Sequence, residues 1–119
     1  MKLVLVGTSH HLAPVELRER VAFPRDAAAA LAGELAESGL ECVCLSTCNR
    51  TELYLATEDP DTAETAAAAK LEAVGSALYR LRDEAAALHL FRVAAGLDSM
   101  VPGEGEILGQ VRTDRKSVV

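Results

Sequence analysis

The chain has 119 residues, of which 50% are hydrophobic and 3% aromatic, which suits one globular domain with a modest core rather than a two-domain enzyme. A formal net charge of −6 argues against a surface that gathers phosphate, so charge alone does not suggest nucleic-acid binding. Three cysteines without a signal-peptide pattern predict a reducing, cytoplasmic location, and no apolar run reaches the roughly 18 residues of a membrane span.

The first half of the chain predicts three strands and one helix. Residues 2–7 (KLVLVG) form a short apolar run that stops at a glycine, which is typical of a buried strand. Residues 24–39 (PRDAAAALAGELAESG) predict a helix with proline in its first turn and glycine at its end. Residues 41–47 (ECVCLST) and 50–57 (RTELYLAT) have strand composition. Because only Cys48 and Asn49 separate them, they predict a tight hairpin.

The second half predicts a helix and then a weaker strand. Asp59 and Pro60 are suited to begin a helix that Gly75 closes. Residues 76–82 (SALYRLR) follow as a candidate fourth strand, although leucine and arginine favour a helix almost as well. The order β-α-β-β-α-β predicts an α+β domain of ferredoxin-like architecture, with a four-stranded antiparallel sheet and two helices on one face.

A C-terminal helix is predicted over residues 84–96 (EAAALHLFRVAAG), with Asp83 as its cap. The expected apolar arc leaves His89 and Arg92 off the buried side. That arc consists of Ala87, Leu88, Phe91, Ala94 and Ala95. Residues 97–106 then predict a polar loop, and residues 107–111 (ILGQV) could open a further helix.

Cys48 is the first candidate for chemistry. At the tip of a tight hairpin its thiol cannot be deeply packed, and a nearby Arg50 would favour the thiolate, which is the nucleophilic form. The alternative is an inert cysteine beside a solvated arginine. Cys42 and Cys44 share one face of their strand and are expected in the core. The spacing C-x-C-x-x-x-C lacks the paired knuckles of structural zinc sites, so no metal is expected.

Other polar residues have more open roles. His89 suits general acid or base chemistry if its helix packs beside the hairpin tip, and is otherwise an exposed surface histidine. The pair His10 and His11 suggests no particular role. The loop after the last helix offers groups that suit a polar substrate with an ammonium group, although a solvated loop explains them equally. These groups are Asp98, Ser99, Glu104 and Glu106.

Three stretches of the chain, GTSHHLAPVELRERVAF, LSTCNRTELY and LHLFRVAAGLDSMVPGEGEILGQV, strongly resemble the N-terminal catalytic domain of glutamyl-tRNA reductase, in the family's order, over residues 3–111. The resemblance implies a ferredoxin-like domain, in agreement with the predicted elements. It also implies that Cys48 attacks the ester joining glutamate to its tRNA and that the tRNA leaves. NADPH then reduces the thioester to glutamate-1-semialdehyde, the first step of five-carbon tetrapyrrole (porphyrin) synthesis.

The resemblance further implies which residues form the site. It makes Cys48 and His89 catalytic, and gives Arg50 a second possible role, pairing with a substrate carboxylate. The substrate-binding positions that it implies are Thr47, Asn49, Arg50, Ser99, Glu104, Gly105, Glu106 and Gln110. At position 106 the family usually has glutamine, so Glu106 adds a negative charge there.

Whole proteins of this family also have an NADPH-binding domain and a helical dimerisation domain. No G-x-G-x-x-G follows a strand in this chain, so the NADPH domain is expected to be absent and reductase activity from the chain alone is not expected. The implied partners are glutamyl-tRNA and, for the whole protein, a second copy and the downstream aminomutase.

The catalytic domain is expected over residues 1–113. Residues 114–119 (DRKSVV) correspond to one translation of a common sequencing adaptor, and they are predicted to be a non-native tail. Two alternatives to an incomplete glutamyl-tRNA reductase stay open at this point. They are a small ferredoxin-like ligand-binding module without chemistry, and a non-functional gene fragment.

Overall fold

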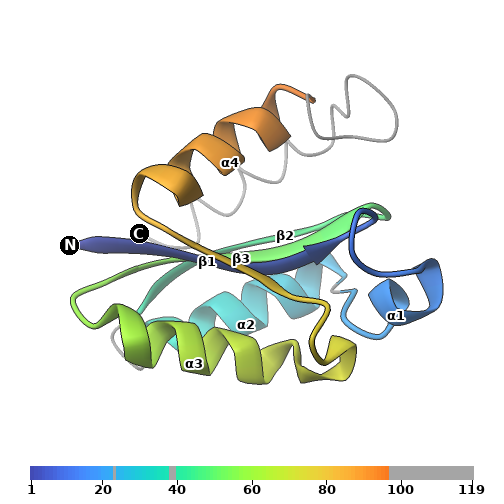
Figure 1. Ribbon diagram of the computed structural model, residues 1–119. Helices are drawn as coiled ribbons and strands as arrows, with labels where there is room; N and C mark the ends of the chain where they lie inside the picture. The colour runs from blue at the N-terminus through green and yellow to red at the C-terminus, as the bar shows by residue number, and fades with distance from the viewer. Residues whose placement is uncertain (23, 38–39, 97–119) are drawn as a thin grey trace.

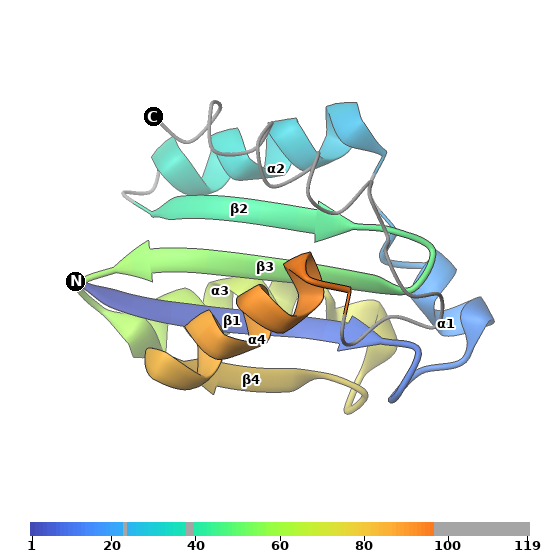
Figure 2. The same ribbon diagram turned by 90° about the horizontal axis from the view of Figure 1, so that it is seen from above.

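A computed structural model describes residues 1–22, 24–37 and 40–96. Four antiparallel strands form one sheet in the spatial order β2-β3-β1-β4 (Figures 1 and 2). The strands are β1 (Lys2–Ser9), β2 (Glu41–Ser46), β3 (Arg50–Thr57) and β4 (Tyr79–Arg82). The helices are α1 (Val15–Glu19), α2 (Arg25–Glu37), α3 (Pro60–Lys70) and α4 (Glu84–Ala94), with a 3-10 turn η1 at Glu72–Val74. The predicted element order and ferredoxin-like sheet are confirmed.

Helices cover both faces of the sheet. Figure 1 shows α2 and α3 against one face and α4 against the other. The α2–α3 side holds the larger apolar cluster, to which β2 contributes Cys42 and Cys44, both at most 2% exposed. This burial confirms the prediction that these two cysteines are core thiols. The α4 side holds a smaller cluster that includes Leu5, Leu45 and Tyr54. Because β3 is central and covered on both faces, it carries almost no exposed position.

The segment between β1 and α2 forms a short helix that the sequence prediction does not include. After β1 the carbonyl oxygen of Ser9 accepts hydrogen bonds from the amides of Leu12 and Ala13, both at 3.0 Å, and α1 begins at Val15. β1 itself extends two residues beyond the predicted glycine. Together these features place α1 at the end of the sheet, next to the turn between β2 and β3 (Figure 2).

The apolar arc predicted for α4 is wrong. Leu88 is 55% exposed and Phe91 is 72% exposed, whereas Ala86 and Val93 are fully buried. Leu90 packs beside them against the sheet. The helix carries apolar residues on more than one side, and the stripe that meets the sheet is the one containing His89. The sequence prediction left His89 off the buried side because burying a histidine is costly unless a hydrogen-bond partner is present, and no partner could be seen in the sequence.

Asp83 lies before α4, but its side chain makes no capping hydrogen bond. Its backbone has the unusual φ of 52°, and its carboxylate accepts from the amide of Leu3 at 3.1 Å. The Asp83 amide in turn donates to the Leu3 carbonyl oxygen at 2.8 Å. Asp83 therefore joins the start of α4 to β1, rather than acting as the predicted side-chain cap.

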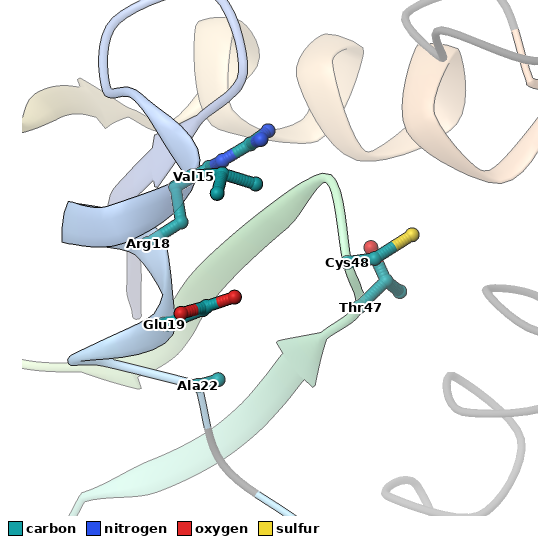
Figure 3. Close-up of a pocket in the computed structure, with 6 residues that line it drawn as sticks. All are labelled: Val15, Arg18, Glu19, Ala22, Thr47 and Cys48. Atoms are coloured by element: carbon teal, nitrogen blue, oxygen red, sulfur yellow. The ribbon is translucent and has the colours of Figure 1, made fainter.

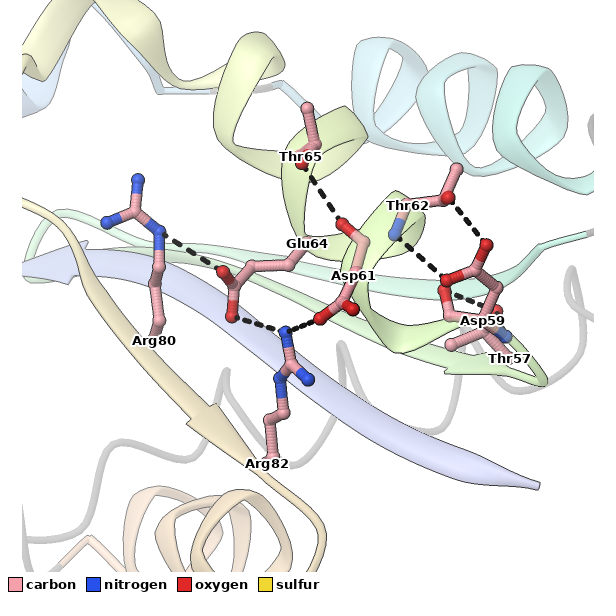
Figure 4. Close-up of polar contacts among 8 residues, drawn as sticks. All are labelled: Thr57, Asp59, Asp61, Thr62, Glu64, Thr65, Arg80 and Arg82. Carbon is pink, nitrogen blue, oxygen red and sulfur yellow. Dashed lines mark hydrogen bonds and ion pairs between the residues drawn. The ribbon is translucent and has the colours of Figure 1, made fainter.

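Charged side chains connect α3 to the edge strand β4 (Figure 4). Arg82 donates to Asp61 at 2.9 Å and to Glu64 at 3.3 Å, and Arg80 lies 3.9 Å from the other oxygen of Glu64. At the start of α3 the Asp59 carboxylate accepts from the amide of Thr62, which confirms the predicted cap. These partly exposed pairs contribute little energy each and form a structural contact rather than a site. None of the helices in the described ranges is long and apolar enough to cross a membrane.

Candidate functional site

The turn between β2 and β3 presents Cys48 to solvent. The amide of Thr47 donates to the carbonyl oxygen of Arg50 at 2.8 Å, which leaves Cys48 and Asn49 as the two tip residues. Cys48 is exposed, while Asn49 is 7% exposed. The Asn49 amide donates to the Thr47 hydroxyl at 3.1 Å, a local bond that suits a tight turn. The predicted hairpin and the exposure of the tip cysteine are both present in the structure.

The loop after β1 and the helix α1 support this tip from one side. The carbonyl oxygen of Asn49 accepts from the amide of His10 at 2.8 Å and from a guanidinium nitrogen of Arg18 at 3.4 Å. Hydrogen bonds therefore fix the turn both at its base, between Thr47 and Arg50, and at the carbonyl group of Asn49. A turn that is already fixed loses less conformational entropy on binding a ligand than a flexible one does. The position of Cys48 is therefore well defined although its side chain is exposed.

A small pocket of about 100 Å³ lies between α1 and the tip (Figure 3). Thr47 and Cys48 line it on one side. The facing residues come from α1 and the chain just after it, and are Val15, Arg18, Glu19 and Ala22. Cys48 is thus both solvent-exposed and adjacent to a concave surface of mixed chemistry.

A buried carboxylate lies two residues after Arg50 on the α4 side of the sheet. Glu52 is completely buried, and its Oε1 accepts from the Tyr54 hydroxyl at 2.8 Å. Its Oε2 accepts from the Tyr79 hydroxyl and lies 2.5 Å from Nε2 of His89. The guanidinium of Arg50, also completely buried, is 3.7 Å away. We call these five residues the Glu52 cluster.

Both tyrosines of the chain belong to the Glu52 cluster. Burial raises the pKa of the Tyr54 phenol far above its ordinary value of about 10, and the charge of Glu52 raises it further. The pKa of Tyr79 is raised for the same reasons, with burial again the larger cause. Both phenols therefore stay protonated and act as donors to the carboxylate.

Gly7 of β1 makes room for the Glu52 cluster. In the sheet it pairs with Glu52 on one side and with Tyr79 on the other. A Cβ at this position would lie 2.8 Å from Cγ of Glu52 and 2.9 Å from the carbonyl oxygen of Thr51, and both distances are shorter than a Cβ atom normally makes to any heavy atom. The buried carboxylate side chain occupies the space that a side chain at residue 7 would need.

The structure separates the predicted site residues into groups. Cys48 is exposed at the tip with Thr47 beside it, whereas Arg50 and His89 meet at the buried Glu52. The side chain of His89 is 18% exposed and faces the sheet, where it meets Glu52. Among the described residues, no hydrogen bond or ion pair joins His89 to Cys48. The predicted positions that lie outside the described residues are Ser99, Glu104, Gly105, Glu106 and Gln110.

Sequence reasoning missed Glu52, Tyr79 and Arg18. One signal was available for Glu52, because polar residues at alternate positions of a central strand share one face. Arg50, Glu52 and Tyr54 follow that pattern, which predicts a polar layer beneath whatever covers the strand. No comparable signal marks Arg18, since the short helix α1 was not predicted.

A four-stranded antiparallel sheet in the order β2-β3-β1-β4, with helices on both faces and one exposed cysteine at the tip of a tight hairpin, defines the class as an α+β domain of ferredoxin-like architecture. The particular family follows from comparison with known proteins. Residues 6–118 match the family described as "Glutamyl-tRNAGlu reductase, N-terminal domain", and the chain belongs to that family.

Relatives and a solved structure agree with this membership. The chain is 44% identical over 117 residues to a glutamyl-tRNA reductase of Myxococcus xanthus, and 48% identical over 112 residues to one of Deinococcus radiodurans. Each alignment covers 94% of this chain, but 26% and 32% of those relatives. The structure of glutamyl-tRNA reductase from Methanopyrus kandleri matches with a TM-score of 0.77 and 36% identity, over 98% of this chain and 28% of that one. The chain therefore spans about a quarter to a third of the length of these relatives.

Proposed function

We propose that this domain carries the acyl-transfer step of a glutamyl-tRNA reductase, the first step of tetrapyrrole synthesis. The observation that carries the proposal is the exposed Cys48 at the tip of a braced hairpin, within the motif that resembles the family's T-C-N-R. The thiolate of Cys48 attacks the ester carbonyl of glutamyl-tRNA. A carbon–sulfur bond forms, the bond between the acyl carbon and the 3′ oxygen of the ribose breaks, and that oxygen takes a proton from water and leaves as a hydroxyl.

The site favours sulfur over oxygen as the nucleophile. A cysteine is partly ionised near neutral pH and intrinsically nucleophilic, so it needs less activation than a serine at the same position. The resulting thioester is also a better hydride acceptor than the original ester. An exposed position is required as well, because the donor is the end of a large nucleic acid that cannot enter a buried cavity.

The glutamyl group is proposed to lie on the α4 side of the tip. Strand pairing places Leu45 opposite Glu52, and the Thr47 amide bonds to the Arg50 carbonyl. Thr47 therefore lies opposite Arg50 at the base of the tip, and Arg50 shares the α4 face with Glu52. Because Arg50 already faces Glu52, a substrate carboxylate that pairs with it shares the guanidinium rather than neutralising an isolated charge.

His89 is proposed to support the reaction through one ring nitrogen. Its Nε2 is 2.5 Å from Glu52, and a histidine whose one nitrogen is bonded to a carboxylate has its tautomer and ring orientation set by that bond. Only Nδ1 then remains to exchange a proton with a substrate or to position it. Glu52 is thus a positioning residue for His89 in this scheme.

The described residues do not fit the NADPH that the reduction requires. A dinucleotide is usually held by a glycine-rich turn between a strand and the N-terminus of a helix. Here β1 leads through Ser9 and Pro14 into the five-residue helix α1, and the connection contains no glycine. The chemistry proposed for this chain therefore ends at the thioester, which water can release as free glutamate. Hydride transfer is assigned to the longer proteins of the family.

The test is incubation of the chain with glutamyl-tRNA, an acid quench and intact-mass analysis. A glutamyl adduct is expected on the wild-type chain and on Cys44→Ala, which removes a buried thiol, but not on Cys48→Ser. Circular dichroism verifies that each sample is folded. A folded wild-type chain that acquires no adduct would contradict the proposal and favour a ligand-binding module without chemistry.

A further inference from the structure

The two oxygen atoms of the Glu52 carboxylate have different partners. Oε1 accepts from the Tyr54 hydroxyl at 2.8 Å. Oε2 accepts from the Tyr79 hydroxyl and also lies 2.5 Å from Nε2 of His89. Tyr79 and His89 therefore share one carboxylate oxygen, whereas Tyr54 binds the other. The proposed function makes Glu52 orient His89 and leaves Tyr79 without a role.

The sheet allows a tyrosine of the edge strand to reach this oxygen. Gly7 of β1 pairs with Glu52 of β3 on one side and with Tyr79 of β4 on the other. Two strand spacings, together about 10 Å, separate the backbones of Glu52 and Tyr79. Because Gly7 has no side chain, the phenol of Tyr79 can cross β1 and place its hydroxyl at the carboxylate. Phenylalanine fills the same space but ends short of Oε2.

Tyr79 also contacts His89 through its ring. The two ring centroids are 5.2 Å apart and the ring planes are inclined by 52°. The phenol ring therefore limits how the imidazole can tilt, while the phenol hydroxyl holds the oxygen atom that the imidazole binds. Both contacts act on the orientation of His89.

We infer that Tyr79 is a positioning residue for His89, and that its hydroxyl moderates the attraction of Glu52 for the imidazole. The inference rests on the proposed function for the part that His89 plays in the reaction. A carboxylate oxygen that already accepts one hydrogen bond attracts a second donor less strongly, because the first donor stabilises part of its charge. Glu52 then holds the ring in place while less of its charge favours the protonated imidazole. Nδ1 of His89 therefore remains a proton acceptor at a lower pH than it would beside a carboxylate without this donor.

The charged and titratable groups that face His89 from the sheet in the described structure come from two strands. They are Arg50, Glu52 and Tyr54 of β3 and Tyr79 of β4. On α4 itself, Arg92 lies about one turn further along and is exposed to solvent. Arg50 lies 3.7 Å from the same Oε2 and is retained when Tyr79 is changed. A change in the behaviour of His89 on removal of the Tyr79 hydroxyl therefore reports that hydroxyl.

Titration of His89 by NMR tests the inference without requiring any acyl transfer. The imidazole carbon–proton signals of the three histidines are followed against pH, and the His89 signal is the one absent from His89→Gln. Tyr79→Phe is expected to raise the pH midpoint of this signal by about half a unit to one unit. One lost hydrogen bond to a charged group changes the balance between two protonation states by a similar amount.

Two control variants separate this effect from a loss of stability. Tyr54→Phe removes the same kind of hydroxyl from the other carboxylate oxygen, so it is expected to move the midpoint less than half as far. Val74→Ala removes buried apolar contacts on the opposite face of the sheet, and is expected to leave the midpoint unchanged. Circular dichroism verifies that each chain is folded. No shift in Tyr79→Phe, or an equal shift in either control, would overturn the inference.

A second measurement keeps the hydroxyl of Tyr79 in place, and so stays informative if Tyr79→Phe does not fold. The chain has two tyrosines, so 3-fluorotyrosine incorporated into Tyr54→Phe labels Tyr79 alone. Fluorine makes the phenol hydroxyl a stronger donor, so the His89 midpoint is expected to fall below that of unlabelled Tyr54→Phe. An unchanged or raised midpoint would contradict the moderating role of the hydroxyl.

The outcomes also separate this inference from the proposed function. A midpoint shift without any glutamyl adduct on the wild-type chain contradicts the acyl-transfer proposal and leaves the positioning of His89 by Tyr79. An adduct without a midpoint shift does the reverse. With glutamyl-tRNA as donor and at a pH below the midpoint, Tyr79→Phe is expected to slow acylation at saturation by about threefold to tenfold, the factor that corresponds to the shift. KM is expected to stay unchanged, because the Tyr79 hydroxyl is bonded to Glu52 rather than to the substrate.

Discussion

Raising the pH above the ordinary range of tyrosine should unfold the domain through the Glu52 cluster. The hydroxyl groups of Tyr54 and Tyr79 donate hydrogen bonds to the same carboxylate. Burial is the larger cause and the charge of Glu52 the smaller one, and together they raise the pKa of both phenols far above 10 in the folded state. In the unfolded chain both phenols titrate near about 10. A raised folded pKa means that this contribution to stability is complete below about pH 10 and is lost as the pH rises beyond it.

The size of the effect follows from the number of phenols. At about pH 11 each unfolded tyrosine has released its proton, which favours unfolding by about 1.4 kcal/mol per residue and about 3 kcal/mol for the pair. That loss is a large share of a small domain's free energy of unfolding, which begins at about 5 kcal/mol. The two residues are the only tyrosines in the chain, so the phenolate signal comes from this cluster alone.

The assay compares phenolate absorbance with helix content by circular dichroism across an alkaline titration. Both signals are expected to change together in one cooperative step, because ionisation requires unfolding. Tyr79→Phe should halve the pH dependence of the free energy of unfolding, and the chain in urea should titrate near the ordinary value. Phenolate absorbance that rises near about pH 10 while the helices stay intact would refute the burial of these hydroxyls at the carboxylate.

Three further predictions concern stability measured by urea denaturation. Glu52→Gln removes the charge opposite the buried Arg50 and should lower the free energy of unfolding by about 3–5 kcal/mol, and an unchanged urea midpoint would contradict the pairing. Gly7→Ala introduces a methyl group where Glu52 approaches and should cost about 1–3 kcal/mol, so a neutral result would show that the strands can separate freely. On α4, Val93→Ala should cost about 2 kcal/mol and Phe91→Ala less than about 0.5 kcal/mol; the reverse order would restore the arc predicted from sequence.

Local sequence was sufficient for the order of the four strands with helices α2, α3 and α4, and for the hairpin tip. Each boundary is marked by residues whose backbone preferences act within a few positions, such as Pro60 at the start of α3. The two-residue separation of β2 from β3 leaves few conformations, so the exposure of Cys48 follows from spacing alone. The burial of Cys42 and Cys44 follows equally from the two-residue period of a strand.

The Glu52 cluster could not be predicted in this way, because its partners are distant in sequence. Tyr79 and His89 follow Glu52 by 27 and 37 residues. A glutamate in a strand carries no local sign of which residues will cover it, and a histidine on a helix carries none of whether it will be buried. The pattern Arg50, Glu52, Tyr54 indicates a polar layer, but the identity of its partners requires the packing of α4 on the sheet.

The error in the α4 arc and the missed carboxylate have one physical cause. Apolar residues lie on several sides of α4, so hydrophobic burial alone favours more than one rotation of the helix about its axis. Only the observed rotation brings Nε2 of His89 to Glu52, and any other leaves this buried carboxylate with one partner fewer. A hydrogen bond to a buried charge is worth about as much as burying one leucine or phenylalanine side chain, so it can decide between rotations that bury similar apolar area. The helix orientation is therefore tied to the strand that begins two residues after Cys48, so substitutions in α4 should alter the tip as well as the core.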